Sequence, residues 1–111
     1  FQALQFKLAD MTTELVAARH LVRLAATKID SKHPEATVYS AMAKRFATDI
    51  GFNVCNEALQ IFGGYGYLQE FPLERYVRDV RVHQILEGTN EIMRMIIGRR
   101  MLMEGATEII Q

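Results

Sequence analysis

The fold is decided by residues 2–29, QALQFKLADMTTELVAARHLVRLAATKI, which contain neither glycine nor proline. Apolar side chains recur along this stretch at alternating steps of four and three residues, the spacing of a helix packed lengthwise against another helix. At about 1.5 Å per residue, the predicted helix is roughly 40 Å long. Its apolar stripe comprises Leu4, Leu8, Met11, Leu15, Ala18, Val22, Ala25 and Ile29, and its opposite face carries Lys7, Asp10, Glu14 and Lys28.

The rest of the chain also favours helices. Pro34 suits the first turn of a second helix, and glycines at 63, 64 and 66 end that helix. Either Thr89 or Asn90 can cap the last helix, whose many apolar residues predict burial on more than one side. The helices that we expect after the first cover about 34–61, 73–80 and 89–103.

These patterns predict an all-α fold, an antiparallel up-and-down helical bundle over residues 1–103 followed by a C-terminal tail over 104–111. Three or so helices leave one long hydrophobic side poorly covered. We therefore expect the domain to be partial, with its first helix missing, either upstream or supplied by another subunit. Phe1 lies inside a helical pattern, which indicates a chain cut from a longer one.

Composition excludes several classes of protein. The chain has 111 residues, and 50% of them are hydrophobic, which argues against disorder. Its 13 basic and 13 acidic residues give a net charge of zero, which argues against nucleic acid as a partner. No apolar run approaches the roughly 20 residues of a membrane span, and no secretion signal opens the chain. The single cysteine, Cys55, excludes an intrachain disulfide, and three scattered histidines argue against a metal site.

Glu87 is the first candidate for chemistry. It follows the apolar pair Ile85-Leu86 and precedes Gly88, just before the last predicted helix. A partly desolvated carboxylate there would have a raised pKa, which suits a general base. The alternative is a carboxylate that interacts with the positive end of the helix dipole. The residues alone favour this alternative.

The glycine turn is the second candidate. Bare backbone at Gly63 and Gly64 would let a ligand approach closely, with Gln60 as a polar contact in the preceding helical turn. The alternative is a tight turn that only ends a helix. The spacing matches no phosphate-binding loop and therefore favours the plain turn.

Three motifs in order resemble the C-terminal helical domain of acyl-CoA dehydrogenases. They are QIFGGYGY at 60–67, RYVRD at 75–79 and QILEGTNEI at 84–92. The segments GGYGY and RVHQILEG are most similar to short-chain and branched-chain members. The resemblance implies an FAD-dependent enzyme that removes a proton from the α-carbon and a hydride from the β-carbon of an acyl-CoA, leaving 2,3-enoyl-CoA.

The resemblance implies a role for each matching residue. Glu87 would be the catalytic base, with its backbone N–H donating to the thioester carbonyl, and Gly88 would leave room for the substrate. Arg99 matches a position that contacts the CoA portion. The matches to FAD-contacting positions are Thr89 and Glu91 at the start of the last helix, and Gln60, Gly63 and Gly64, which would touch the FAD of a neighbouring subunit. Glu91 replaces a glutamine that is frequent at its position.

The resemblance also implies partners. We expect a homo-oligomer, a dimer of dimers, with an electron-transfer flavoprotein as electron acceptor, in the cytoplasm of a bacterium or the mitochondrial matrix of a eukaryote. Because most of the FAD would be bound outside this chain, we expect the isolated chain to be inactive. The alternative function is a non-catalytic helical oligomerisation module derived from the same fold.

Overall fold

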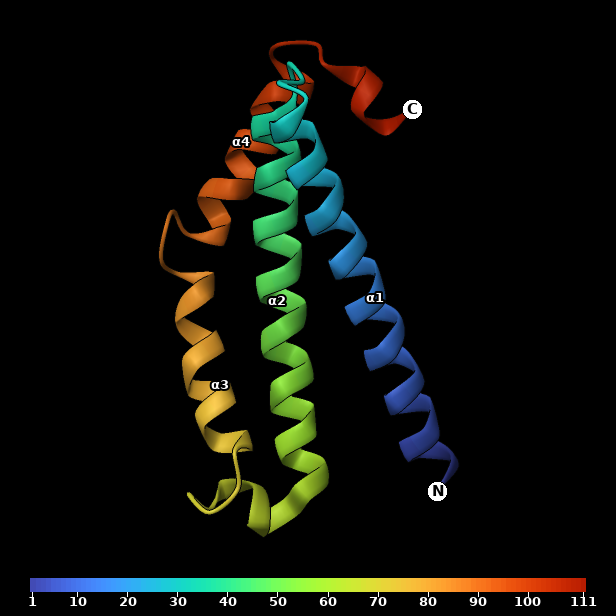
Figure 1. Ribbon diagram of the computed structural model, residues 1–111, viewed down its shortest axis with the longest axis vertical. Helices are drawn as coiled ribbons and strands as arrows, with labels where there is room; N and C mark the ends of the chain where they lie inside the picture. The colour runs from blue at the N-terminus through green and yellow to red at the C-terminus, as the bar shows by residue number, and fades with distance from the viewer.

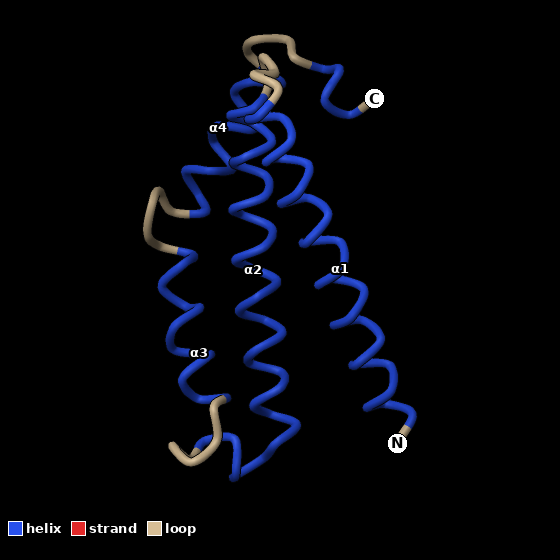
Figure 2. Tube along the Cα trace, in the orientation of Figure 1, coloured by secondary structure: helices blue, strands red, loops and turns tan.

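The computed structural model describes the backbone of residues 1–111 and every side chain except that of Thr107. Helices and turns form this whole region, which contains no strand (Figure 2), so the predicted all-α class is confirmed. The elements are α1 (Gln2–Asp30), α2 (Ala36–Phe62), η1 (Gly63–Tyr67), α3 (Leu73–Arg81), η2 (Val82–Gln84), α4 (Asn90–Leu102) and η3 (Thr107–Ile110), where η marks a 3₁₀ helix.

The central helix of the bundle is α2 (Figure 1). It runs antiparallel to α1, which packs along one side, while α3 and then α4 return along the other side and form a third column. The domain measures 49 × 30 × 25 Å. The turn containing η1 lies at one end of the long axis, and the end of α4 lies with η3 at the other.

Local chemistry explains where the helices begin and end. The turn before α2 is held by the His33 Nδ1, which accepts the Glu35 backbone N–H at 3.0 Å. Gly63 ends α2 with φ 65°, a left-handed conformation that favours glycine. Gly66 packs so closely that an added Cβ would lie 2.6 Å from the Leu59 carbonyl oxygen. Of the two predicted caps, Thr89 is the one that caps α4, because its Oγ1 accepts the backbone N–H of Ile92 at 3.3 Å.

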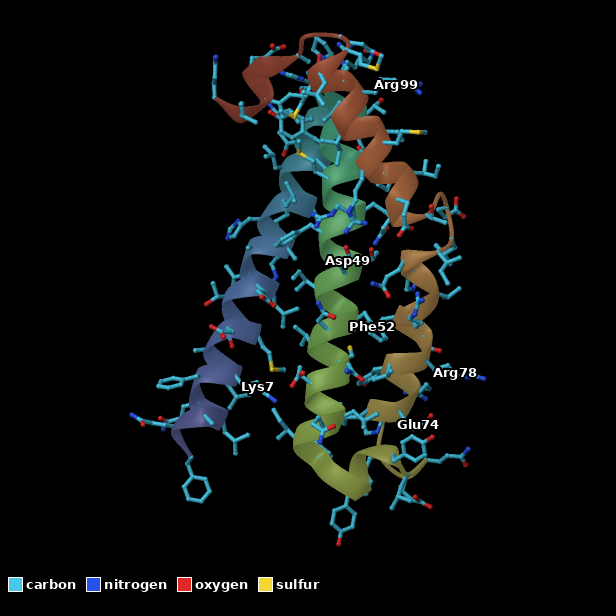
Figure 3. All side chains as sticks on the ribbon, turned by 180° about the vertical axis from the view of Figure 1, so that it is seen from behind. Lys7, Asp49, Phe52, Glu74, Arg78 and Arg99 are labelled. Atoms are coloured by element: carbon cyan, nitrogen blue, oxygen red, sulfur yellow. The ribbon has the colours of Figure 1, made fainter. Side chains whose placement is uncertain are left out.

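The face of α1 that contacts α2 is rotated from the predicted stripe. Ala18 and Ala25 are buried as expected. Lys7 and Lys28, predicted on the opposite face, instead contact α2: the Lys7 Nζ lies 2.6 Å from the Glu57 Oε2, and the Lys28 Nζ lies 5.1 Å from the Tyr39 ring centre. Their long aliphatic stems pack beside the helix while the ammonium groups reach polar or aromatic partners. Figure 3 shows Lys7 on the α2 side of α1.

As expected, an apolar side of α1 stays uncovered in the described chain, and its exposed residues are Leu4, Leu8, Leu15, Val22 and Ile29. The expectation for α4 is wrong within this chain. Ile92, Met95 and Leu102 are exposed, because the chain supplies a packing partner, α2, on one side only. Among the described residues, no helix has a stretch long and apolar enough to cross a membrane.

Candidate functional site

The loop between η2 and α4 carries Glu87 in an unusual backbone conformation. Glu87 has φ 57° and Gly88 has φ 85°, so both lie in the left-handed region. A residue with a Cβ pays roughly 1–2 kcal/mol there. An added Cβ at Gly88 would lie 2.7 Å from the Cε at the end of the flexible Met93 side chain, which would have to rotate away. Strain of this kind persists where the surrounding structure enforces it, and it gathers at functional sites.

The carboxylate of Glu87 is exposed in this chain. Its apolar neighbours Ile85 and Leu86 are exposed as well, at 52% and 36%, and do not cover it. The expected partial desolvation is therefore not supplied by the described chain. Any apolar cover for Glu87 must come from another surface, such as a bound substrate or a further domain.

A single carboxylate oxygen ties down both ends of this loop. The Oδ1 of Asp49, on α2, accepts the Gln84 Nε2 at 2.9 Å and the Asn90 Nδ2 at 2.7 Å. Gln84 lies three residues before Glu87, and Asn90 lies three residues after it. Figure 3 shows Asp49 midway along α2, between the columns. The strained segment is thus bracketed by two amides that share one acceptor.

Lys44, also on α2, holds the middle of the loop. Its Nζ donates to the Gly88 carbonyl oxygen at 2.7 Å and to the Asn90 Oδ1 at 2.6 Å. Asn90 is only 3% exposed, and its Nδ2 also donates to the Thr48 Oγ1 at 2.9 Å. We call Asp49, Lys44, Asn90 and Gln84 the loop network.

Asp49 stays ionised inside this network. Burial alone would raise its pKa, but the hydrogen bonds from Gln84 and Asn90 and the charges of Arg94 and Arg45 outweigh burial and hold the pKa below its usual range. The Arg94 Nη2 lies 3.1 Å from the Asp49 Oδ2.

A groove of about 530 Å³ adjoins the network between α2, η2 and α4. Its wall mixes cationic, acidic and apolar groups, and it includes Glu91 from the predicted cofactor set. The lining residues are Arg45, Phe46, Asp49, Ile50, Asn53, Arg81, Gln84, Ile85, Asn90, Glu91 and Arg94.

The remaining predicted site residues lie apart from Glu87. Arg99 is exposed on α4, roughly 15 Å along the helix axis from Thr89 at about 1.5 Å per residue. Figure 3 shows its side chain pointing away from the bundle. Gln60, Gly63 and Gly64 are exposed at the C-terminal end of α2, at the end of the bundle away from Arg99 (Figure 1). Within one chain, only Glu87, Gly88, Thr89 and Glu91 lie together.

A second polar cluster fastens the other end of α4. The Arg100 Nε and Nη2 donate to the two carboxylate oxygens of Glu35 at 2.8 and 2.6 Å, and Arg100 also pairs with Glu104. Glu35 is 3% exposed. The hydrogen bonds from Arg100 hold the pKa of Glu35 below its usual range, although burial opposes them. We call Glu35, Arg100 and Glu104 the terminal lock.

Other candidates from the sequence carry no site. Gly51, inside α2, has no atom within 4 Å of an added Cβ, so close packing does not explain this glycine. Cys55 is half-buried, and burial raises the pKa of its thiol, so the reactive thiolate is disfavoured. The described residues contain no group of three or more His, Cys, Asp or Glu side chains placed to hold a metal ion.

Comparison with known proteins decides the family. The family model of the acyl-CoA dehydrogenase C-terminal domain matches residues 1–102. The chain belongs to the acyl-CoA dehydrogenase family. The resemblance drawn from the glycine turn and the Glu87 motif is thereby confirmed, while the roles of the individual site residues stay predictions.

Its relatives include branched-chain enzymes. The chain is 57% identical over 101 residues to the mitochondrial isobutyryl-CoA dehydrogenase of Dictyostelium discoideum, covering 91% of this chain and 24% of that protein. It is 56% identical over 103 residues to the mitochondrial isobutyryl-CoA dehydrogenase of Bos taurus, covering 93% and 25%. The chain spans about a quarter of the length of these relatives.

Solved structures share the fold. Butyryl-CoA dehydrogenase from Megasphaera elsdenii matches with TM-score 0.85 and 50% identity, covering 88% of this chain and 25% of that one. A chain in a structure of the electron transferring flavoprotein of Acidaminococcus fermentans matches with TM-score 0.88 and 49% identity, covering 92% and 27%. These matches support the predicted helical bundle.

Proposed function

We propose that this chain is the base-carrying part of an FAD-dependent acyl-CoA dehydrogenase. In the full protein, Glu87 removes a proton from the α-carbon of the acyl-CoA thioester, and the product is 2,3-enoyl-CoA. The observation that carries the proposal is the left-handed Glu87, strained and exposed on a loop bracketed from α2.

The carboxylate of Glu87 is free to accept a proton. It takes part in none of the ion pairs found among the described residues. Bound substrate would exclude water from the carboxylate and raise its affinity for a proton, since burial disfavours the charged form. This cover replaces the desolvation that the chain itself does not supply.

The backbone of the same loop suits charge stabilisation. In the proposal, the Glu87 N–H donates to the thioester carbonyl oxygen, where negative charge develops as the α-proton leaves. Gly88 presents no side chain beside it. A donor fixed in advance is worth more than one that must reorganise during the reaction.

The residues of this chain fit a flavin, which when bound would accept the hydride from the β-carbon. Gly64 is exposed, and nothing lies within 4 Å of an added Cβ. Packing in this chain thus gives no reason for a glycine there, whereas close approach of a cofactor does. Gln60 can hydrogen-bond beside it, as can Thr89 at the start of α4. The Glu91 carboxylate can accept from a hydroxyl or N–H but would repel a phosphate.

We propose a short or branched acyl-CoA as substrate, with isobutyryl-CoA as the first compound to test, because the relatives at 56–57% identity are isobutyryl-CoA dehydrogenases. The exposed guanidinium of Arg99 suits a phosphate of the CoA portion. Electrons would pass to an electron-transfer flavoprotein, and the exposed apolar side of α1 would be covered in a homo-oligomer, a dimer of dimers.

The test uses a full-length acyl-CoA dehydrogenase that carries this domain. Glu87→Gln keeps the shape of the side chain but cannot accept the proton. Turnover of isobutyryl-CoA with an artificial electron acceptor should fall by a factor of about 10²–10⁴ or more. The flavin absorption spectrum and the melting temperature should not change. Retained turnover would show that the base lies elsewhere.

The isolated chain provides a second test. With no domain to hold the hydride acceptor, it should show no flavin-dependent oxidation of any acyl-CoA, even with FAD added. Measurable oxidation would contradict the proposed division of labour between this chain and the rest of the enzyme.

The exposed apolar side of α1 also favours the alternative, a non-catalytic oligomerisation module. The two functions predict different colours. A full-length protein that assembles but stays colourless in excess FAD would support the module, and a yellow protein that reduces its flavin on adding acyl-CoA would exclude it.

A further inference from the structure

Resting on the proposed role of Glu87, we propose that the loop network works as a staple whose members, Asp49, Lys44, Asn90 and Gln84, are positioning residues for the base. They fix the left-handed segment 87–88 relative to α2. The network touches the loop only on the side of α2 and leaves the exposed carboxylate of Glu87 free.

The staple has one fixed point. Gln84 and Asn90 donate to the same oxygen of Asp49, at 2.9 and 2.7 Å, so the two ends of the loop are held close to each other. The five residues between these anchors must close a tight arc. The positive φ angles of Glu87 and Gly88 reverse the direction of the backbone between the two anchors. The strain at the base is therefore imposed by the anchors.

Lys44 fixes the orientation of the Asn90 side-chain amide. An ammonium group can only donate, so the Asn90 Oδ1 must face Lys44, and the Asn90 Nδ2 must face the Asp49 carboxylate, which can only accept. The opposite amide orientation would place donor against donor and acceptor against acceptor. Lys44 also donates to the Gly88 carbonyl, the group next to the base.

The position of the loop is set by the central helix, α2. Lys44 and Asp49 lie on α2, the one helix in contact with α1, α3 and α4 alike. A catalytic group set by packed helices keeps its position better than one on a free loop, and a misplacement of about 1 Å can cost a factor of 10² in rate.

The experiment measures kcat and KM separately in a full-length acyl-CoA dehydrogenase carrying this domain. Asp49→Ala should lower kcat by a factor of about 10², and Gln84→Ala and Lys44→Met by about 10 each, with KM changing less than about threefold. Asp49→Asn keeps an acceptor oxygen for both amides but turns its Nδ2 toward the donor Arg94, and it should recover part of the lost kcat. General weakening of the fold would not give this rescue.

Glu35→Ala is the matched control. Like Asp49→Ala, it removes a carboxylate of the α2 region that binds α4. Glu35, however, binds the C-terminal end of α4, away from the Glu87 loop. It should lower the melting temperature and leave kcat within about twofold.

The outcomes separate the two proposals. If Asp49→Ala does not fold, the half-buried Gln84 and Lys44 carry the test, since after their removal the Asp49 carboxylate still pairs with Arg94. Wild-type kcat in both Gln84→Ala and Lys44→Met, alongside an inactive Glu87→Gln, would overturn the staple and keep the base. An active Glu87→Gln would overturn both.

Discussion

The two ends of α4 are both fastened by carboxylates from the α2 side, yet they do different things. At the first end, Asp49 binds amides on either side of a strained loop, and Lys44 binds the loop backbone itself. At the last end, Glu35 binds the Arg100 side chain. One cluster holds the shape of a loop, while the other only holds a helix in place.

Burial does not distinguish these clusters. Asn90 and Glu35 are each 3% exposed, and hydrogen bonds keep the pKa of Asp49 and of Glu35 below the usual range. The difference lies in what each cluster encloses. The loop network brackets the left-handed Glu87, a predicted site residue, whereas the positive φ angles beside the terminal lock belong to Lys32 and Gly105, which are not predicted site residues. Mutations at one end should therefore change activity, and those at the other should change stability.

Of the variants that leave Glu87 and the loop network in place, Gly88→Ala should have the largest effect. The new Cβ would meet the Met93 Cε at 2.7 Å and would also sit at φ 85°. The Met93 side chain can rotate away from the new Cβ, but alanine relieves its positive φ only by moving the loop, so we expect kcat to fall by a factor of about 10–100, as for other small displacements of a catalytic group. Steady-state kinetics of the full-length enzyme measures this. An alanine variant with full kcat would show that the loop tolerates displacement.

Two neighbouring arginines offer the next test. Arg100→Met leaves Glu35 buried without its main partner, which should lower the melting temperature by several degrees and leave kcat unchanged. Arg99→Met, at the exposed position beside it, should leave the melting temperature unchanged and raise KM for the acyl-CoA. Thermal unfolding and kinetics of the same pair of variants check both. A fall in kcat for Arg100→Met would erase the distinction between the two ends.

Acid should weaken both ends. The pKa values of Glu35 and Asp49 are lower in the folded state than their ordinary values near 4, so the folded state binds fewer protons. Their stabilisation is complete above the ordinary values and is lost as the pH falls through the folded-state values, below about pH 4. The difference in melting temperature between wild type and Glu35→Gln should thus narrow on acidification. A constant difference would contradict this.

The smallest expected change in stability is a gain. Glu87→Gly removes the cost of a left-handed residue with a Cβ and should stabilise the protein by about 1 kcal/mol while abolishing turnover. Chemical denaturation measures it. Lower stability would mean that the Glu87 side chain supports the fold, which would contradict a purely catalytic role.

The sequence predicted the helices well because their limits are local. Gly63 and the Thr89 cap each determine a boundary through their own backbone chemistry, whereas Pro34 lies in the turn two residues before α2 and not in its first helical turn. Hydrophobic spacing was less informative about direction: it placed Lys7 and Lys28 on the polar face of α1, although both contact α2. Long side chains reach across a helix edge, and a period of 3.5 does not resolve such a rotation.

The site was predictable only in part. Glu87 followed from its motif and family resemblance, and its role remains a proposal. Asp49 and Lys44 were missed, because each meets the loop across more than thirty residues of sequence and leaves no periodic pattern. Asn90 was considered only as a helix cap. One signal for Asn90 was present in the sequence. A helix needs only one N-cap, and Asn90 directly follows Thr89, so one of these two residues was free for another role.

The central claim is that Glu87 moves the α-proton, and solvent isotope exchange tests it most directly. A full-length enzyme carrying this domain is incubated in D₂O with an acyl-CoA that cannot lose a β-hydride, and deuterium at the α-carbon is followed by mass spectrometry. Wild type should exchange the α-hydrogen, and Glu87→Gln should exchange it slower by a factor of about 10²–10⁴ with its flavin still bound. Equal exchange in the two proteins would contradict the claim.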